Sequence, residues 1–306
     1  MNIKDIKALN KRVKINTSLH VLMLPAVVLL LIFNYGPMVG MVIGFQRFIP
    51  TKGFFGSEWV GLDNLTYLLR LPSTLQVIWN TVYIAFMKIV AGLIFPITFA
   101  LLLNEVRRES FKKAVQTILY MPHFLSWVIL SGIIIDILSP SKGIVNNVLK
   151  QFGFKPIFFL GSTKMFPYLM VFLDTWKELG FGMIIYLAAL TAIDPQLYEA
   201  IIVDGANRWR QTWHITLPGM LPIIILMSTL SLGRILNAGF DQIFNLYSPI
   251  VYETGDILDT LTYRIGLVNG QYAIGAIAGT FKSVVSLLFI GSSYYMAYKF
   301  TDYRIF

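Results

Sequence analysis

The chain has 306 residues, of which 56 % are hydrophobic and only 13 % are charged, whereas a soluble domain carries about 25 % charged residues. This composition excludes an ordinary soluble protein and indicates an integral membrane protein. The net charge of +9 comes from lysines and arginines beside hydrophobic stretches, where such residues orient membrane helices, so we expect the lipid bilayer and not nucleic acid as the partner.

Two kinds of site are excluded or disfavoured by composition. Cysteine is absent, so disulfides, thiol catalysis and zinc–thiolate sites are excluded. Three scattered histidines (His20, His123 and His214) have no metal-ligand spacing, and we predict no metal site.

The first predicted element is a basic N-terminal segment, residues 1–18, that contains Lys4, Lys7, Lys11, Arg12 and Lys14. Residues 19–44 contain no Asp, Glu, Lys or Arg, and roughly 20 apolar residues suffice to cross a bilayer. Five further apolar stretches follow. We therefore predict an all-α membrane protein, with a transmembrane domain over 19–306 that forms a bundle of six helices at about 19–44, 77–103, 117–139, 166–190, 220–240 and 276–298.

The distribution of basic residues predicts the orientation of these spans. Thirteen lysines and arginines fall in the N-terminus and in segments 104–116, 191–219 and 299–306, against eight in the segments on the opposite side. Because cytoplasmic loops carry the excess of positive charge, we expect both termini in the cytoplasm.

The external segments 45–76, 140–165 and 241–275 are rich in glycine, proline and aromatic residues. Loops of this length are uncommon unless they have a function. They are expected to form either a platform for an external partner or caps over the helix ends, and the sequence does not choose between these.

The cytoplasmic segment 194–218 is predicted to form two short helices joined at Gly205. Asp194 followed by Pro195 is typical of a helix N-cap with proline at the first helical position. The pair Asp204-Gly205 is a turn signal, because glycine adopts the positive φ that reverses the chain.

Two interpretations of this segment follow from its residues. Trp209 and Trp213 are four residues apart and share one helical face. They would anchor an amphipathic helix in the headgroup layer. Alternatively, the segment is a docking element for another protein.

A resemblance favours docking. The segment resembles the cytoplasmic loop of binding-protein-dependent ABC importer permeases, in which Glu-Ala-Ala is followed after three residues by Gly and after nine more by Ile-x-Leu-Pro. The matching residues are Glu199, Ala200, Gly205, Ile215, Leu217 and Pro218. Ile201 departs from the pattern, since alanine is usual there. The residues around Asp204, Ala206 and Ile215 resemble those of the carbohydrate-uptake branch of this family, as do Trp176-Lys177 and Gly180.

The resemblance implies a bacterial inner-membrane permease that imports an oligosaccharide by alternating access. The loop, with Trp209 among its contact residues, would dock a coupling helix into a nucleotide-binding ATPase subunit, where Glu199 pairs with a basic group and Gly205 sets the angle between the helices. A second homologous permease, in a heterodimer, and an extracytoplasmic substrate-binding protein are implied as further partners.

The chain itself is not expected to be an enzyme or to bind a cofactor. It contains no Gly-x-x-x-x-Gly-Lys-Ser/Thr phosphate loop, so ATP and Mg²⁺ would be held by the partner subunits.

Charged residues inside the predicted spans are candidates for the substrate path, because a charge at mid-bilayer is unfavourable by about 2.5–3.5 kcal/mol. Four are basic and one is acidic: Lys88, Lys177, Arg234, Lys282 and Glu178. Their excess of positive charge, and a resemblance to acidic-polysaccharide importers of the alginate type, lead to the hypothesis of an acidic, uronate-type cargo. Trp176 and Tyr272 are candidate sugar-stacking residues. A simpler interpretation is that Lys177 and Glu178 pair with neighbours while Lys282 extends outward.

Two other classes of function compete with the importer. An ion-coupled secondary transporter would explain the membrane charges but leaves the pattern in 198–218 to chance. A membrane-embedded enzyme would need a catalytic constellation, and the sequence has neither a histidine cluster nor carboxylates paired at a workable spacing.

Overall fold

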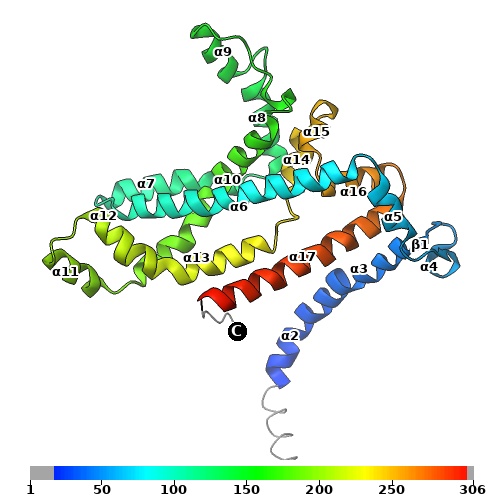
Figure 1. Ribbon diagram of the computed structural model, residues 1–306, viewed down its shortest axis with the longest axis horizontal. Helices are drawn as coiled ribbons and strands as arrows, with labels where there is room; N and C mark the ends of the chain where they lie inside the picture. Colours follow the sequence, from blue (N-terminus) through cyan, green and yellow to red (C-terminus); the bar gives the residue numbers. More distant parts are fainter. Residues whose placement is uncertain (1–16, 302–306) are drawn as a thin grey trace, which may run out of the picture.

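The computed structural model describes residues 17–301, and almost all of the predicted basic N-terminus, together with Arg304, lies outside the described residues. The described chain is almost entirely helical, as predicted (Figure 1). Its only strands, β1 (Gln46–Arg47) and β2 (Glu58–Trp59), form a short antiparallel ribbon within residues 17–301. The main helices are α2 (Thr17–Leu30), α5 (Asp63–Arg70), α6 (Thr74–Asn104), α7 (Glu109–Tyr120), α8 (Trp127–Leu138), α9 (Ile144–Gln151), α10 (Phe166–Thr191), α11 (Pro195–Val203), α12 (Arg208–Gln211), α13 (Leu217–Leu232), α14 (Phe240–Leu246), α16 (Leu258–Tyr263) and α17 (Tyr272–Thr301).

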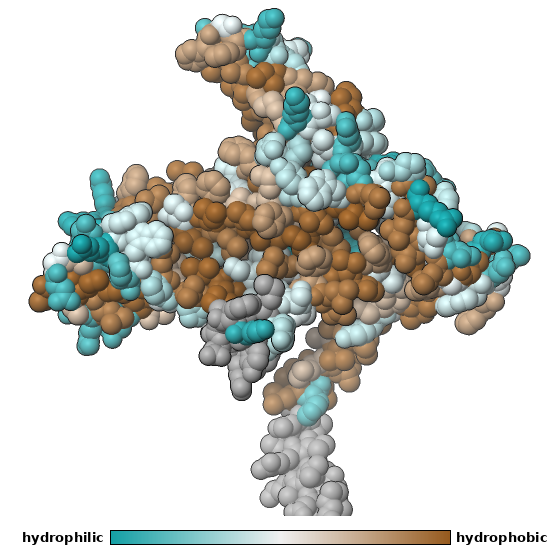
Figure 2. All heavy atoms as spheres, viewed as in Figure 1, coloured by the Kyte–Doolittle hydropathy of each residue, from teal (hydrophilic) through white to brown (hydrophobic). Residues whose placement is uncertain are grey.

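An apolar band separates two polar ends of the molecule. In Figure 2 hydrophobic side chains cover the middle of the molecule, whereas hydrophilic ones gather over α11 and α12 at one end and over the β1–β2 ribbon and α4 (Gly53–Gly56) at the other. Four helical segments are long and apolar enough to cross a membrane: Leu19–Phe45, Thr74–Asn104, Arg208–Leu232 and Tyr272–Tyr295. Two bent helix pairs raise the number of candidate spans to six within the described residues.

The expected span 117–139 differs in the structure, because it is not one continuous helix. The segments Glu109–Phe124 and Trp127–Leu138 meet at an angle of 104°. Pro122 has no N–H to continue the helical hydrogen bonding, and the Ser126 hydroxyl accepts a hydrogen bond from the Ile129 N–H and so begins a new helix. The span was predicted from hydrophobicity alone, which does not report the effect of Pro122 or the helix cap at Ser126.

The expected span 220–240 also needs correction. Helix α13 ends at Leu232, and an irregular segment, residues 233–239, leads to Gly239 before α14 begins. Gly239 has φ +91°, a conformation that ends any continuous right-handed helix. Arg234 therefore lies in a non-helical segment and not inside a spanning helix.

Helices α6 and α10 cross at the centre of the bundle, and the other helices pack around them (Figure 1). Gly180 of α10 lets α7 approach closely, because a Cβ atom there would lie 2.2 Å from the Leu119 carbonyl oxygen. At the other side, Gly44 brings the first apolar helix against Ile277 of α17. The rest of that first helix leans away from the body and contains no buried residue.

Candidate functional site

The loop between α10 and α13 forms a separate polar end of the molecule (Figure 1). The Asp194 carboxylate caps α11 by accepting a hydrogen bond from the Gln196 N–H at 2.9 Å, and Pro195 occupies the first turn, both as predicted. Glu199 and Ala200 are exposed on α11. Three apolar side chains of this helix are also exposed, Leu197 by 52 %, Ile202 by 57 % and Val203 by 86 %.

Gly205 makes the turn between α11 and α12. Its φ is +77°, which confirms the predicted positive angle. The Ala206 N–H donates to the Ile201 carbonyl and the Gly205 N–H donates to the Ile202 carbonyl, both at 3.0 Å. This is the Schellman arrangement that ends a helix with glycine in the left-handed region. The two short helices on either side of Gly205 are therefore confirmed, while their docking role stays a prediction.

Side-chain contacts fix the loop to the spanning helices. Arg208 of α12 pairs with Glu105 at the end of α6, with 2.8 Å between Nη1 and Oε2. The Tyr198 hydroxyl lies 3.0 Å from the Thr216 Oγ1. Trp209 packs edge-on against Trp213, with ring centroids 5.9 Å apart. These contacts connect α11 to the helical turn that precedes α13, and α12 to the end of α6.

The last residues of the motif lie in the spanning helix and not in the docking segment. Ile215 belongs to a π-helical turn, η5 (Thr212–Thr216), and Leu217 and Pro218 begin α13. They lie inside one continuous helical run, Arg208–Leu232, in which Pro218 has no N–H for the helical hydrogen bonding and directly follows the π-helical turn. Glu199 and Ala200, in contrast, are exposed on α11.

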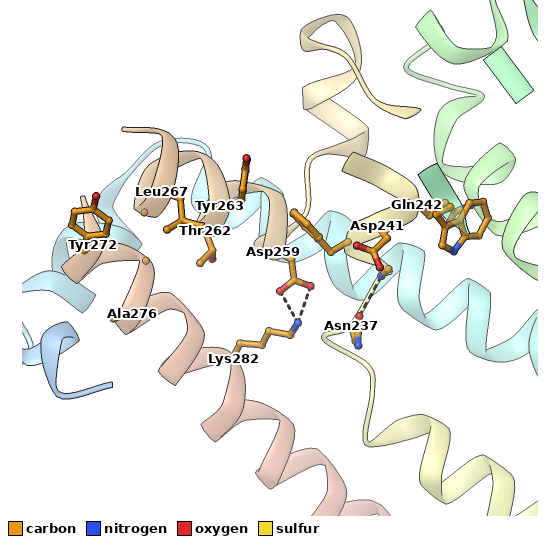
Figure 3. Close-up of a pocket in the computed structure, with 15 residues that line it drawn as sticks. Asn237, Asp241, Gln242, Asp259, Thr262, Tyr263, Leu267, Tyr272, Ala276 and Lys282 are labelled. Atoms are coloured by element: carbon orange, nitrogen blue, oxygen red, sulfur yellow. Dashed lines mark hydrogen bonds and ion pairs between the residues drawn. The ribbon is translucent and has the colours of Figure 1, made fainter. Parts of the chain in front are cut away.

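A cavity of about 770 Å³ lies between α14, α16 and α17 (Figure 3). We call it the outer cavity because Tyr272 on its wall packs against Phe48, beside β1. Tyr272 and Lys282 line it, and the Lys282 Nζ lies 2.6 Å from the Asp259 Oδ1. Lys282 therefore does not extend outward, contrary to the simpler interpretation. Trp127, Tyr263 and Asp241 also line this cavity, which combines aromatic rings with polar groups.

An inner cavity of about 340 Å³ adjoins the outer one, since both are lined by Asn237 and Gly239. Its wall carries Lys88, whose side chain is 9 % exposed and whose Nζ lies 3.1 Å from the Asp174 Oδ1. The same ammonium donates to the Ala238 carbonyl at 2.7 Å and to the Gln242 side-chain oxygen. Lys88 thereby ties α6 to α10 and to the irregular segment before α14.

Lys177 and Glu178 pair with neighbours, as the simpler interpretation predicts. The Lys177 Nζ donates to the Glu178 carboxylate at 3.1 Å and to the His123 carbonyl at 2.9 Å. The second Glu178 oxygen lies 2.7 Å from the His123 ring. Lys177 is buried and lines neither cavity, and Trp176 is exposed on α10 and also lines neither.

Arg234 lines the inner cavity and is exposed. Within residues 17–301 its guanidinium has no hydrogen-bonding or ion-pair partner. Of the predicted path residues, the structure brings Lys88, Glu178 and Arg234 to one cavity and Tyr272 and Lys282 to the other.

An ionic and aromatic cluster is centred on Asp256, shortly before α16. Arg264 pairs with buried Asp256 at 2.5 Å and lies over the Tyr252 ring at 4.5 Å. Burial and a hydrogen bond with Tyr252 raise the pKa of Tyr247 to about 12. This tyrosine therefore stays neutral at physiological pH.

Sequence reasoning missed the partners of the membrane lysines. Asp259 and Gln242 come from the region predicted as an external loop, and Asp174 lies within α10. A charged residue within an apolar stretch signals a partner but does not say which one, because these partners are between 23 and 154 residues away. No cluster of three or more potential metal ligands occurs among the residues that the structure describes.

Comparison with known proteins decides the family. Residues 92–301 match the family described as "binding-protein-dependent transport system inner membrane component". The chain belongs to this family. As a member of it, the chain is a multi-pass membrane transport subunit and not an enzyme, and the predicted family is confirmed.

Individual relatives of this transport subunit agree. It is 40 % identical to the polygalacturonan/rhamnogalacturonan transport system permease protein YteP of Bacillus subtilis, over 94 % of this chain and 90 % of that protein. It is 37 % identical to the protein LplB of the same organism, over 94 % and 91 % of the two chains. A chain in the crystal structure of a bacterial ABC transporter involved in the import of the acidic polysaccharide alginate matches it with a TM-score of 0.89 and 38 % identity, covering 96 % of this chain and 99 % of that chain.

Proposed function

We propose that this chain is one of two permease subunits of an ATP-driven importer, which takes an oligosaccharide from an external binding protein and releases it into the cytoplasm. The observation that carries this proposal is the exposed α11–Gly205–α12 loop, with its motif, in a chain of the binding-protein-dependent transport family. A homologous alginate transporter has been crystallised in complex with its pentasaccharide-bound periplasmic protein, which supports an external binding protein as partner.

In this proposal α11 is the coupling helix. Leu197, Ile202 and Val203 leave an apolar surface beside Glu199 on a polar end of the molecule. A helix laid into a groove buries such a surface, and the ATPase subunit provides the groove. ATP-driven closure of two ATPase subunits would then move α11 and α12. The contacts of Tyr198 with Thr216 and of Arg208 with Glu105 would pass this movement to the spanning helices.

The proposed orientation places the loop in the cytoplasm, with both chain termini on the same side. The excess of lysine and arginine in the N-terminus and in segments 104–116, 191–219 and 299–306 supports this orientation. The β1–β2 ribbon and α9 would then face the external binding protein.

The proposed cargo is an acidic, uronate-type oligosaccharide. Two observations support it: YteP is a permease for polygalacturonan and rhamnogalacturonan, and the crystallised relative imports alginate. The outer cavity, with aromatic rings and polar groups side by side, has the composition of a saccharide site.

Co-purification and uptake test this function together. The complete importer, purified through this chain, is expected to contain the ATPase, and Glu199→Ala is expected to lower ATP-dependent uptake at least tenfold by weakening docking. Glu109→Ala, at an exposed glutamate in the first turn of α7, serves as the matched control. Uptake that needs no ATPase and follows an ion gradient would instead establish the secondary-transporter alternative.

A further inference from the structure

The cations of the membrane region divide into two classes. Lys88, Lys177 and Lys282 each have a carboxylate within 3.1 Å, so their charge is compensated inside the chain. Arg234 is the exception in the described part of the chain, because nothing there accepts a hydrogen bond from its guanidinium. Three of the four basic candidates for the substrate path are therefore paired with a carboxylate of the chain, and Arg234 is left to bind a ligand.

The acids of the inner cavity do not compensate Arg234. Asp174 is bound to Lys88, and Glu178 is shared between Lys177 and His123. With these pairs cancelled, the residual charge of the inner cavity is the guanidinium of Arg234. The outer cavity has the opposite residual charge, since Asp259 is paired with Lys282 while Asp241 has no partner among the described residues. A carboxylate is thus favoured at the inner cavity and not at the outer one.

The segment that carries Arg234 is held in place. Its backbone N–H donates to the Ser231 carbonyl at 2.9 Å, and its carbonyl accepts from the Asn237 N–H at 2.7 Å. Lys88 fixes the end of the same segment at Ala238. A Cβ atom on Gly239 would lie 2.9 Å from the Lys88 Nζ, so glycine is what lets the ammonium reach this backbone. Arg234 is presented to the cavity from a fixed backbone.

Guanidinium chemistry specifies the ligand. An isolated cation in the membrane is unfavourable, so such residues are functional candidates that face a partner or a cavity. The planar guanidinium binds a carboxylate through two parallel hydrogen bonds, which an ammonium does not. Ser231 and Asn237 in the same cavity offer neutral groups to sugar hydroxyls.

We propose that Arg234 is the specificity-determining residue of the inner cavity, where it binds a carboxylate of the uronate cargo during transport. This inference rests on the proposed function and adds to it the residue that distinguishes acidic from neutral saccharides. Lys88 acts as a positioning residue that holds the segment of Arg234.

The test uses the complete importer in proteoliposomes, with its binding protein and ATP. The probes are a uronate tetrasaccharide and the same tetrasaccharide with its carboxyl groups reduced to alcohols. Arg234→Gln is expected to lower uptake of the uronate at least tenfold, with Arg234→Lys between this variant and the unmodified chain. The effect on the reduced probe should be less than twofold. Arg70→Gln, at an exposed arginine on α5, is the matched control and should change neither.

The binding-protein-stimulated ATPase activity should persist in Arg234→Gln, because the coupling loop is untouched. Equal loss of uptake for both probes, or unchanged uptake of the uronate, would overturn the assignment. Loss of the partner subunits on purification of Arg234→Gln would also overturn it, since Arg234 would then hold the assembly together. If the unmodified importer transports only the reduced probe, the acidic cargo fails while the importer stands. If it transports neither probe with ATP, the proposed function itself fails.

Discussion

At the scale of single residues, Gly205 and Lys88 fix the backbone at the two places on which the proposed function depends. Gly205 provides a backbone conformation that other residues adopt only with strain, between two helices that are otherwise ordinary. Lys88 donates three hydrogen bonds, to Asp174, Gln242 and the Ala238 carbonyl, and so holds the irregular segment that follows the end of α13. Each residue can be changed alone, and each has a matched control in the same chain.

We expect Gly205→Ala to impair coupling through backbone strain. No atom lies within 4 Å of a Cβ placed there, so the substitution acts through φ +77° and not through a clash. The left-handed conformation is unfavourable for alanine by about 1–2 kcal/mol. ATP-dependent uptake should fall several-fold, with the unfolding temperature slightly lowered. Gly270→Ala is the control, since Gly270 has φ +70° and equally open surroundings in the turn before α17. Equal uptake by the two variants would contradict the special role of Gly205.

We expect Lys88→Met to destabilise the bundle strongly. The substitution leaves Asp174 and Gln242 without their ammonium partner, and breaking a buried ion pair in this way is unfavourable by roughly 3–5 kcal/mol. The measurement is the thermal unfolding of the detergent-solubilised chain. Lys142→Met, at an exposed lysine, should have no effect. Lys88→Met combined with Asp174→Leu should recover part of the loss, and an absence of recovery would argue against the pair.

At the scale of elements, the helices are positioned by close approaches at small residues. The contact of α7 with α10 depends on Gly180, where the Leu119 carbonyl takes the place of a side chain. The same α7 is continuous with the sharp turn that holds His123 beside Glu178. Packing at Gly180 therefore supports the wall of the inner cavity.

Gly180→Ala is expected to lower the free energy of unfolding by about 1–3 kcal/mol, because a methyl group there overpacks the interface. Gly132→Ala on α8 is the matched control, since nothing lies within 4 Å of a Cβ at that position. That control should be neutral or stabilising by about 0.5–1 kcal/mol, the amount that separates alanine from glycine in a helix. Thermal unfolding in detergent compares the two, and equal effects would show that α7 can shift without loss.

At the scale of the whole molecule, the proposed orientation places α7 and α11 on the cytoplasmic side and α9 on the outside. Because the chain has no cysteine, single cysteines report sidedness without background. We expect Ser141→Cys, between α8 and α9, to react with a membrane-impermeant maleimide in intact cells. Ser110→Cys, in the first turn of α7, should react only after permeabilisation. Both serines are exposed, so a reversed pattern would invert the topology.

The geometry of the loop between α10 and α13 was predicted from local chemistry, whereas its docking role stays a prediction. The cap at Asp194, the positive φ at Gly205 and the pairing of Trp209 with Trp213 each depend on residues close in sequence. The spans were predicted less accurately, because hydropathy reports apolar character but not direction. It did not detect the 104° bend after Pro122 or the end of α13 at Leu232.

Composition and local caps, which depend on neighbouring residues, predicted a helical membrane protein with two short helices joined at Gly205. Which membrane charges remain available depends instead on the packing of distant segments. Lys88 meets Asp174, and Lys282 meets Asp259, because packed helices bring distant segments together. The same packing leaves Arg234 without a partner within residues 17–301, and the charge of a cavity is what remains after such pairs cancel.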